Sequence, residues 1–310
     1  MVYISNNGVR SMYMAEIKLF RLDSTVEELK PSETALEHNL QTCIEKNMQA
    51  FFGVRFLRSE YPIANGRMDS IGIDENNCPA IFEYKRSVNE NVINQGLFYL
   101  SWLLDHKDSF KLLVLETLGM EAAQAIDWSA PCVICIARDF TKYDLHAVEV
   151  MRQNIKLVKY KKYADGLILF EHLNAPNVQP TGVDIPPTSE PDSRGVKTHI
   201  EKVATSTPKM HALYEDVCNF IESLGDMTSN QLKLYLAYKK TQNFACIEIY
   251  RDKIILDLKL CPDTVELEEG FTRDMRGIGH YGTGDLQVII PNTAALEKAK
   301  PLLERAYNEA

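Results

Sequence analysis

Apolar positions in the N-terminal half of the chain follow helix and strand periods in turn. Apolar residues recur at helical spacing from Leu36 to Met48, which predicts a helix over residues 31–53, capped by Ser32 and ended by Gly53. The other expected elements are strands over 16–22, 54–63, 66–74, 78–86 and 130–140, helical sequence over 89–119, a helix over 141–153, and a pair of strands over 155–173. The order of helix, three strands, helix, strand, helix and strands predicts an α/β domain.

A change in composition divides the chain after this domain. Residues 174–208 hold six of the thirteen prolines and few long apolar side chains, which is typical of a linker. The pattern beyond it predicts helices over 211–225 and 294–310 and strands over 244–252, 253–260 and 286–291, an α+β arrangement. We therefore expect a loose extension over residues 1–13, an α/β domain over 14–173, a linker over 174–208 and a smaller domain over 209–310.

The stretch "GRMDSIGIDENNCPAIFEYKR", residues 66–86, places charged side chains within an apolar hairpin. Because strand side chains alternate, Glu83 and Lys85 share one face. If the hairpin is symmetric about Asn76, Asp69 lies directly opposite Glu83, with about 4.5–5.5 Å between the Cβ atoms. Like charges placed in this way destabilise a sheet, and a divalent cation between them would relieve the repulsion. Mg²⁺ suits such a site because it binds one or two carboxylates, waters and a substrate phosphate.

These residues resemble the motif of the PD-(D/E)xK nuclease superfamily, an Asp on one strand and Glu/Asp-x-Lys on the next. Asp69 and Glu83-Tyr84-Lys85 match it. The usual proline before the Asp is absent, and Gly66-Arg67 stands there instead, which is similar to the NucS-like and RecB-like branches. The expected order of elements from residue 33 to about 140 also resembles the αβββαβ core of the restriction-endonuclease-like fold.

Two further matches extend this resemblance. Glu37 fits the acidic residue that these branches carry on the first helix, and Gln95 and Tyr99 fit a Gln-x-x-x-Tyr motif whose two residues share a helix face. The resemblance implies that Mg²⁺ or Mn²⁺ is held by Glu37, Asp69, Glu83 and the backbone carbonyl of Tyr84. It implies that Lys85 positions or activates water and that Gln95 orients Lys85 or contacts DNA. It also implies a metal-dependent DNA endonuclease that leaves 5′-phosphate and 3′-hydroxyl ends, in DNA repair or in defence against foreign DNA such as phage DNA.

A basic run follows in "MRQNIKLVKYKKY", residues 151–163. It contains no acidic residue, and its cations are Arg152, Lys156, Lys159, Lys161 and Lys162. Such a run can neutralise phosphates, and the interleaved Tyr160 and Tyr163 can stack on unpaired bases. Further candidates for DNA contact near the hairpin are Arg67, Arg86 and Tyr99. The alternative for the basic run is a solvated strand face.

Each feature also has a simpler structural explanation. Glu83 and Lys85 could form a solvated salt bridge on an edge strand. Asp69 could start a turn, and Glu37 could favour a helix N-terminus by its charge alone. Gln95 and Tyr99 could be ordinary interior polar groups. The matching alternatives in function are a nucleic-acid-binding module with an idle nuclease fold and an interaction protein that acts through its C-terminal domain. That domain resembles an uncharacterised, DUF5655-like module, for which we expect a targeting, recognition or dimerising role.

Composition narrows the class of protein without choosing among these functions. The net charge of -9 gives no sign of nucleic acid, although a basic track can lie within an acidic protein. Cys132 and Cys135 stand in an apolar strand, so we expect buried thiols, and the scattered cysteines suit a reducing cytosol. No apolar run has the length of a membrane span and the N-terminus lacks signal-peptide features, so we expect a cytoplasmic protein without a membrane partner. The Gly-rich "GIGHYG", residues 277–282, lacks the strand and helix of a dinucleotide site and predicts an ordinary loop.

Overall fold

The computed structural model of the 310-residue chain describes residues 17–22, 26–31, 37–85, 92–151, 153–173 and 197–310. The side chains of residues 37–39 lie outside this description, as do Ser32, Arg86, Arg152 and most of the expected linker. The chain divides into two compact units, residues 1–35 with 161–169, and residues 36–160 with 170–310. The predicted domain boundaries stay predictions.

The smaller unit contains a β-hairpin. Strand β1 (Leu19–Leu22) pairs antiparallel with β2 (Val26–Leu29), and Leu19 lies opposite Leu29. The apolar pattern over residues 16–22 predicts the first strand. The second, with sequence VEEL, shows no full alternation, so its strand structure depends on pairing with its neighbour.

A six-stranded mixed sheet forms the frame of the N-terminal half, in the order β3-β4-β5-β6-β7-β8. Its strands are β3 (Val54–Ile63), β4 (Gly66–Asp74), β5 (Pro79–Tyr84), β6 (Cys132–Ala137), β7 (Asn154–Lys162) and β8 (Ile168–His172). Strands β3 to β5 are antiparallel, while β5, β6 and β7 run parallel. Parallel neighbours need crossover connections. These are α2 (Val92–Asp105), α3 (Lys107–Leu118) and α4 (Met120–Gln124) between β5 and β6, and α5 (Lys142–Val150) between β6 and β7.

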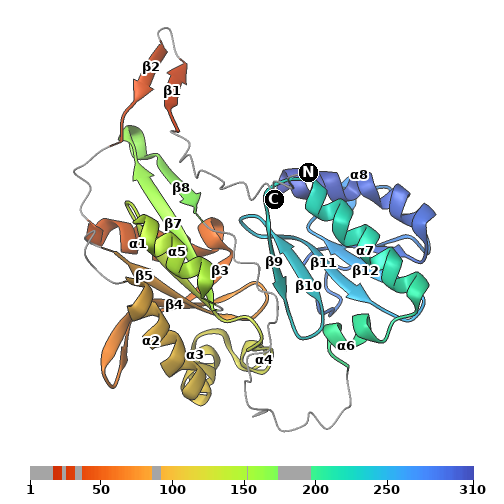
Figure 1. The fold of residues 1–310 in the computed structure, drawn as a ribbon, viewed down its shortest axis with the longest axis horizontal. Helices are drawn as coiled ribbons and strands as arrows, with labels where there is room; N and C mark the ends of the chain where they lie inside the picture. The colour runs from red at the N-terminus through yellow and green to blue at the C-terminus, as the bar shows by residue number, and fades with distance from the viewer. Residues whose placement is uncertain (1–16, 23–25, 32–36, 86–91, 152, 174–196) are drawn as a thin grey trace, which may run out of the picture. The chain divides into compact units, whose positions relative to one another are not determined.

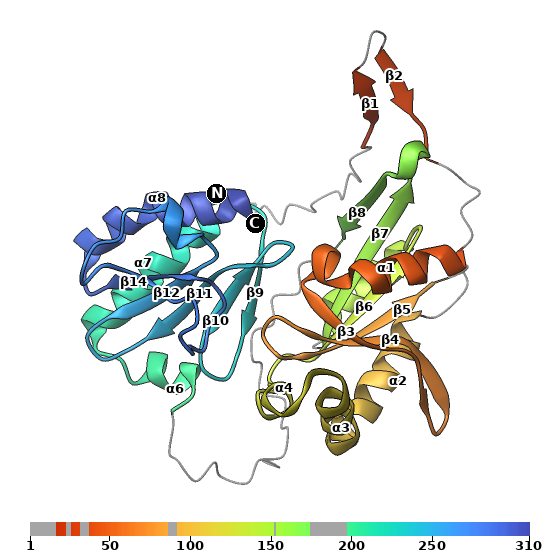
Figure 2. The same ribbon diagram turned by 180° about the vertical axis from the view of Figure 1, so that it is seen from behind.

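Helices cover this sheet on both faces, as Figures 1 and 2 show from opposite sides. Helix α1 (Glu37–Phe52) packs on one face through its buried stripe of Leu40, Ile44 and Met48, and ends at Gly53 in a left-handed conformation, with φ of 66°. On the other face, α2 and α5 pack with Ile71, Ile81 and Val133 in the main apolar core. Strands β5 and β6 are buried almost throughout, which explains their continuous apolar sequences.

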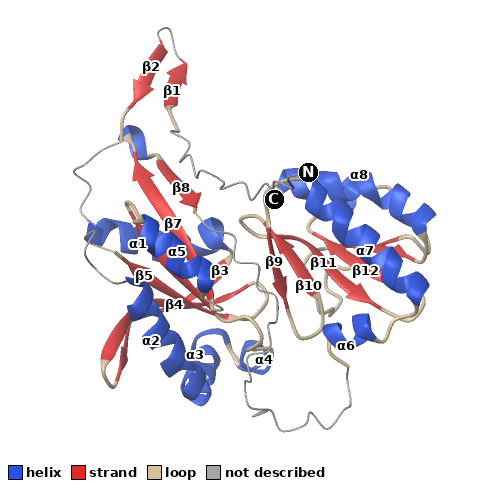
Figure 3. Cartoon of the chain, in the orientation of Figure 1, coloured by secondary structure: helices blue, strands red, loops and turns tan. Residues whose placement is uncertain are grey.

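A second six-stranded sheet, antiparallel throughout, forms the C-terminal half in the order β13-β14-β12-β11-β10-β9. Its strands are β9 (Thr228–Gln231), β10 (Leu236–Lys239), β11 (Asn243–Ile249), β12 (Ile254–Leu258), β13 (Thr272–Asp274) and β14 (Leu286–Ile290). Helices α7 (Pro208–Ser223) and α8 (Thr293–Glu309) bury their apolar stripes against it, and α6 (His199–Ala204) precedes them. Figure 3 separates these helices from the strands by colour.

The predicted order of elements in the N-terminal half is confirmed, with α1, β3 to β5, α2 to α4, β6, α5, β7 and β8 in sequence. The helical stretch over 89–119 is divided at His106, where α3 begins. Helix α6 lies within the stretch predicted as linker, and it is held by a capping box between Thr198 and Glu201. The Gly-rich residues 277–282 are followed by strand β14, which excludes the strand-loop-helix context of a dinucleotide site.

Two further expectations concern cysteines and membranes. Cys132 and Cys135 are buried and free on β6, as their apolar surroundings predict. Among the described helices, none combines the length and the apolar character needed to span a bilayer.

Candidate nuclease site

The two carboxylates of the motif meet where strands β4 and β5 stop pairing. The last paired residues are Ser70 and Phe82, so Asp69 is the next residue on its strand and lies opposite Glu83. The backbone N–H of Asp69 donates to Glu83 Oε1 at 3.3 Å, and the backbone N–H of Tyr84 donates to Asp69 Oδ2 at 3.0 Å. Each carboxylate therefore accepts a hydrogen bond from a backbone amide of the opposite strand. The register predicted from symmetry about residue 76 is confirmed.

Burial and repulsion together make this pair electrostatically unfavourable. Glu83 is only 1% exposed. Burial first, and then the charge of Asp69, raise the pKa of Glu83 to about 9, although the amide of Asp69 opposes the rise. The Glu83 carboxyl therefore keeps its proton at neutral pH unless a cation compensates its charge. Two oxygen-donor carboxylates suit a hard divalent ion such as Mg²⁺ or Mn²⁺.

A third carboxylate, that of Glu60, lies beside Asp69 and Glu83 across the neighbouring strands. Ser59 lies opposite Ser70 and Tyr61 lies opposite Met68, so this register places Glu60 beside Asp69. Glu60 has a φ of 53°, which is uncommon for a residue other than glycine. Such backbone strain is concentrated at functional sites.

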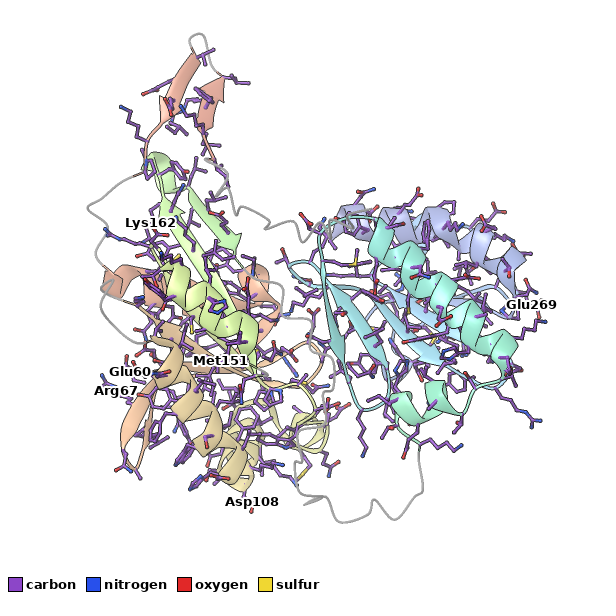
Figure 4. The ribbon with its side chains drawn as sticks, in the orientation of Figure 1. Glu60, Arg67, Asp108, Met151, Lys162 and Glu269 are labelled. Carbon is purple, nitrogen blue, oxygen red and sulfur yellow. The ribbon has the colours of Figure 1, made fainter. Side chains whose placement is uncertain are left out.

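The Glu60 carboxylate is held from two sides. Gln41 Nε2 on α1 lies 3.2 Å from Glu60 Oε1 and 3.0 Å from the carbonyl oxygen of Asp69. Arg67 forms an ion pair with the other oxygen of Glu60, and Figure 4 shows these two side chains next to each other. The charge of Glu60 also contributes to the raised pKa of Glu83, after burial and Asp69. Glu60 therefore belongs to the electrostatic environment of the pair.

Helix α1 reaches the site through polar side chains. Glu45 Oε1 accepts a hydrogen bond from Ser70 Oγ at 2.7 Å, and Ser70 Oγ lies 3.2 Å from the Tyr84 hydroxyl. Glu37, the predicted ligand on this helix, is the first residue of α1, and its side chain lies outside the description. Within the described residues, no three His, Cys, Asp or Glu side chains are grouped closely enough to hold a metal ion. The metal roles of Glu37 and of the Tyr84 carbonyl stay predictions.

Lys85 follows directly after β5 and is nearly enclosed, with its side chain 3% exposed. Its backbone N–H donates to the Ile136 carbonyl at 2.8 Å, which keeps the residue alongside β6. Its Nζ lies 3.4 Å from Asp144 Oδ2 and 5.7 Å from the centre of the Phe140 ring. Both partners follow β6, in the loop before α5 and in the first turn of that helix.

Gln95 and Tyr99 share one face of α2, as their spacing predicts. Gln95 Nε2 donates to the Tyr99 hydroxyl at 3.1 Å, and the backbone N–H of Arg67 lies 3.3 Å from the same hydroxyl. The Tyr99 ring packs against Gly66, where an added Cβ would lie 3.0 Å from it. The pair therefore ties α2 to the start of β4. Tyr99 is 5% exposed, so its ring is not open to stack on a base in this conformation, and its contact with DNA stays a prediction.

The basic run forms β7 and does not make a single track. Lys156 lies opposite Ile134 and Lys159 lies opposite Ala137, so these two lysines point to opposite faces. Lys159 falls in the same row as Lys85, and its Nζ is 2.8 Å from Asp139 Oδ1. The two tyrosines of the run, 160 and 163, are each 5% exposed, so neither ring is available for base stacking in this conformation. Lys161 and Lys162 stay predicted DNA contacts, as do Arg86 and Arg152, which lie outside the described residues.

The sequence interpretation missed four residues that the fold brings to the site. Gln41, Glu45, Glu60 and Asp144 carry no catalytic motif. Thr141-x-x-Asp144 signals a helix start, but the pairing with Lys85 joins residues 59 positions apart. The position of Glu60 follows from the β3–β4 register and its irregularity between Phe56 and Arg58, which the sequence pattern does not show.

Comparisons with known proteins match the C-terminal half of the chain to a family and nearly the whole chain to a relative. Residues 196–310 match the family described as "Domain of unknown function (DUF5655)". An "Uncharacterized protein" of Haemophilus influenzae is 28% identical over 295 residues, which span 92% of this chain and 97% of that protein.

Solved structures with some likeness include a repair endonuclease from Pyrococcus abyssi, at 13% identity and a TM-score of 0.28, and an EndoMS–dsDNA complex, at 16% identity and a TM-score of 0.25. Each match covers 46% of this chain, and it spans 65% of the first structure and 64% of the second. TM-scores this low carry no argument about function. A function therefore has to be inferred from the geometry of the site itself.

Proposed function

We propose that this protein is a metal-dependent DNA endonuclease. The observation that carries the proposal is the meeting of Asp69 and Glu83 at the point where β4 and β5 stop pairing, with Lys85 on the same face as Glu83. A buried carboxyl beside a second carboxylate costs stability. Such a cost is typical of sites that meet a charged ligand or cation.

The donor atoms of this pair suit Mg²⁺ or Mn²⁺, and Asp69 and Glu83 would hold the ion. A bound ion of this kind supplies charge stabilisation at the phosphate and lowers the pKa of its bound water. Two carboxylates are enough because phosphate oxygens and waters complete the coordination of Mg²⁺. Glu37 is a further candidate ligand at the start of α1.

The remaining chemistry falls to the protein side chains. The Lys85 ammonium would stabilise negative charge that develops on the phosphate oxygens and orient the attacking water. Water attacks phosphorus in line, the bond from phosphorus to the 3′-oxygen breaks, and that oxygen takes a proton to become a hydroxyl. The cations expected to position the DNA backbone are Arg67 and Lys159, both now paired with carboxylates that a phosphate could replace.

The proposal is tested by cleavage of end-labelled single-stranded, duplex and forked DNA with Mg²⁺, Mn²⁺ or EDTA. Wild type is compared with Asp69→Asn and Lys85→Ala, and with Lys111→Ala on the exposed side of α3 as a matched control. We expect metal-dependent cleavage by wild type and Lys111→Ala, none by Asp69→Asn, and only a small residual rate by Lys85→Ala. Cleavage by all four proteins would identify a contaminant. A folded wild type that binds DNA but cuts no substrate with either metal would contradict the proposal and favour a nucleic-acid-binding module.

A further inference from the structure

Asp144 lies beside the Lys85 ammonium group and can fix its position. Its Oδ2 atom accepts hydrogen bonds from the Thr141 backbone N–H at 2.7 Å and from the Thr141 hydroxyl at 2.9 Å, and lies 3.4 Å from Lys85 Nζ. The first two contacts belong to the capping box that starts α5. They fix the carboxylate oxygen on a helix end, so it presents a charge of defined position to the ammonium.

Lys85 has little freedom apart from this contact. Its side chain is 3% exposed, and the Phe140 ring lies beneath its ammonium at 5.7 Å. Hydrogen bonds between an ammonium and a carboxylate are usually about 2.7–2.9 Å long. The separation of 3.4 Å is longer than this, so the two groups interact mainly as opposite charges.

A buried thiol on β6 interacts with the charges of Glu83, Lys85 and Asp144. Cys135 lies opposite Glu83 in the parallel ladder, and its thiol is buried. Burial raises the pKa of this thiol, the charges of Glu83 and Asp144 add to the rise, and the charge of Lys85 opposes it. All three charged groups are therefore within electrostatic reach of one buried atom. Asp144 thus belongs to the same site as the carboxylate pair.

We propose that Asp144 is a positioning residue that holds the Lys85 ammonium at the site through the capped end of α5. The inference rests on the proposed nuclease function and adds a residue outside the Asp…Glu-x-Lys motif. Asp144 touches neither the proposed metal nor the phosphate. It acts by fixing where the positive charge stands before the DNA arrives.

Asp144→Asn is the test variant because an Asn side chain keeps an oxygen acceptor for the Thr141 N–H while it removes the charge facing Lys85. Glu201→Gln is the matched control, since it removes the equivalent carboxylate charge from the capping box of α6. We expect Asp144→Asn to lower kcat by up to about 100-fold, with KM for DNA unchanged. Glu201→Gln should keep kcat near that of wild type.

A double variant separates a role through Lys85 from a general structural effect. If Asp144 acts by positioning Lys85, Asp144→Asn causes no further loss of residual activity in a Lys85→Ala background. An equal fractional loss in both backgrounds would overturn the inference, as would a wild-type kcat for Asp144→Asn or an equal loss of kcat in Glu201→Gln. These outcomes are distinct from failure of the proposed function, in which wild type itself does not cleave.

Discussion

Glu83 illustrates how a single buried carboxyl group can lower the stability of the folded protein. Its pKa is raised from 4.5 to about 9, mainly by burial and then by Asp69. The unfolded chain therefore releases this proton at a lower pH than the folded chain does. The folded state loses stability relative to the unfolded state as pH rises from about 4.5 to about 9.

Glu83→Gln removes this titration while it keeps the shape of the side chain. In metal-free protein at pH 7, we expect the variant to be more stable than wild type by up to about 3 kcal/mol, and the difference to shrink toward pH 4.5. Urea unfolding at several pH values, in the presence of EDTA, measures this difference in the free energy of unfolding. Glu116→Gln, on the exposed side of α3, is the control. A difference that is constant with pH, or that grows as pH falls, would contradict the assignment.

The ion pair between Glu60 and Arg67 predicts a competition for DNA. Arg67 can bind a phosphate only after it leaves Glu60, so Glu60→Gln should tighten metal-free DNA binding by an amount worth about 0.2–1 kcal/mol. Arg67→Ala should weaken binding and reduce the slope of log affinity against log salt by about 0.9. Fluorescence anisotropy over a salt series measures both effects.

A control variant distinguishes this competition from simple charge repulsion. In an Arg67→Ala background, Glu60→Gln should have no effect on affinity if it acts by releasing the arginine. The same gain in both backgrounds would show that Glu60 repels DNA directly. Weaker binding by the single Glu60→Gln variant would refute the competition altogether.

Some site residues were predictable from sequence because their relation is local. Asp69 and Glu83 lie in one hairpin, where a short turn sets the register and alternation sets the face. The partners of Lys85 and Glu60 come from other elements, so they depend on how α5 and α1 pack against the sheet. The spacing of residues along the sequence does not show how these helices pack, so the contacts could not be predicted from it.

At the scale of elements, the contact of α2 with β6 controls how close the helix lies to the central strands. Gly96 faces Val133, and an added Cβ would lie 2.5 Å from Val133 Cγ1. Val133 is completely buried and branched at Cβ, so it cannot move aside easily. The close approach keeps Gln95 and Tyr99, which neighbour Gly96 on the helix, at the start of β4.

Gly96→Ala tests this packing. We expect it to destabilise the protein by about 1–3 kcal/mol, because the new methyl group overpacks the interface. In a Val133→Ala background the clash is absent, and the higher helix propensity of alanine should make Gly96→Ala neutral or stabilising, by up to about 1 kcal/mol. Denaturant unfolding of the four proteins gives the coupling. Equal costs in both backgrounds would show that the contact does not limit the approach.

The elements themselves were predictable where apolar periodicity was strong. The buried runs of β5 and β6 and the apolar stripe of α1 are visible in the sequence. Strand β9, with sequence TSNQ, has no apolar residue and forms through pairing with β10. Strand β13 is three residues long and pairs at the edge of its sheet. Such strands depend on a partner far away in the sequence, so local propensity misses them.

At the scale of the whole molecule, the chain carries two sheets that each have an apolar core. The first core contains residues from β3 to β7 and α2 to α5, and the second contains residues from β10, β11, β12, β14, α7 and α8. The match to the DUF5655 family covers residues 196–310 and includes the whole second core. A core that is closed by its own helices is the property expected of a domain that folds alone.

A fragment of residues 196–310 should therefore fold without the rest of the chain. Val217 on α7 and Leu303 on α8 are fully buried in the second core. We expect one cooperative urea transition by circular dichroism, with an m-value of about 1–3 kcal/mol/M. A fragment of residues 226–310 lacks α7 and uncovers part of the sheet, so it should show no such transition. If the longer fragment also lacks a cooperative transition, the C-terminal sheet depends on the N-terminal half for its stability, and the two halves are not separate folding units.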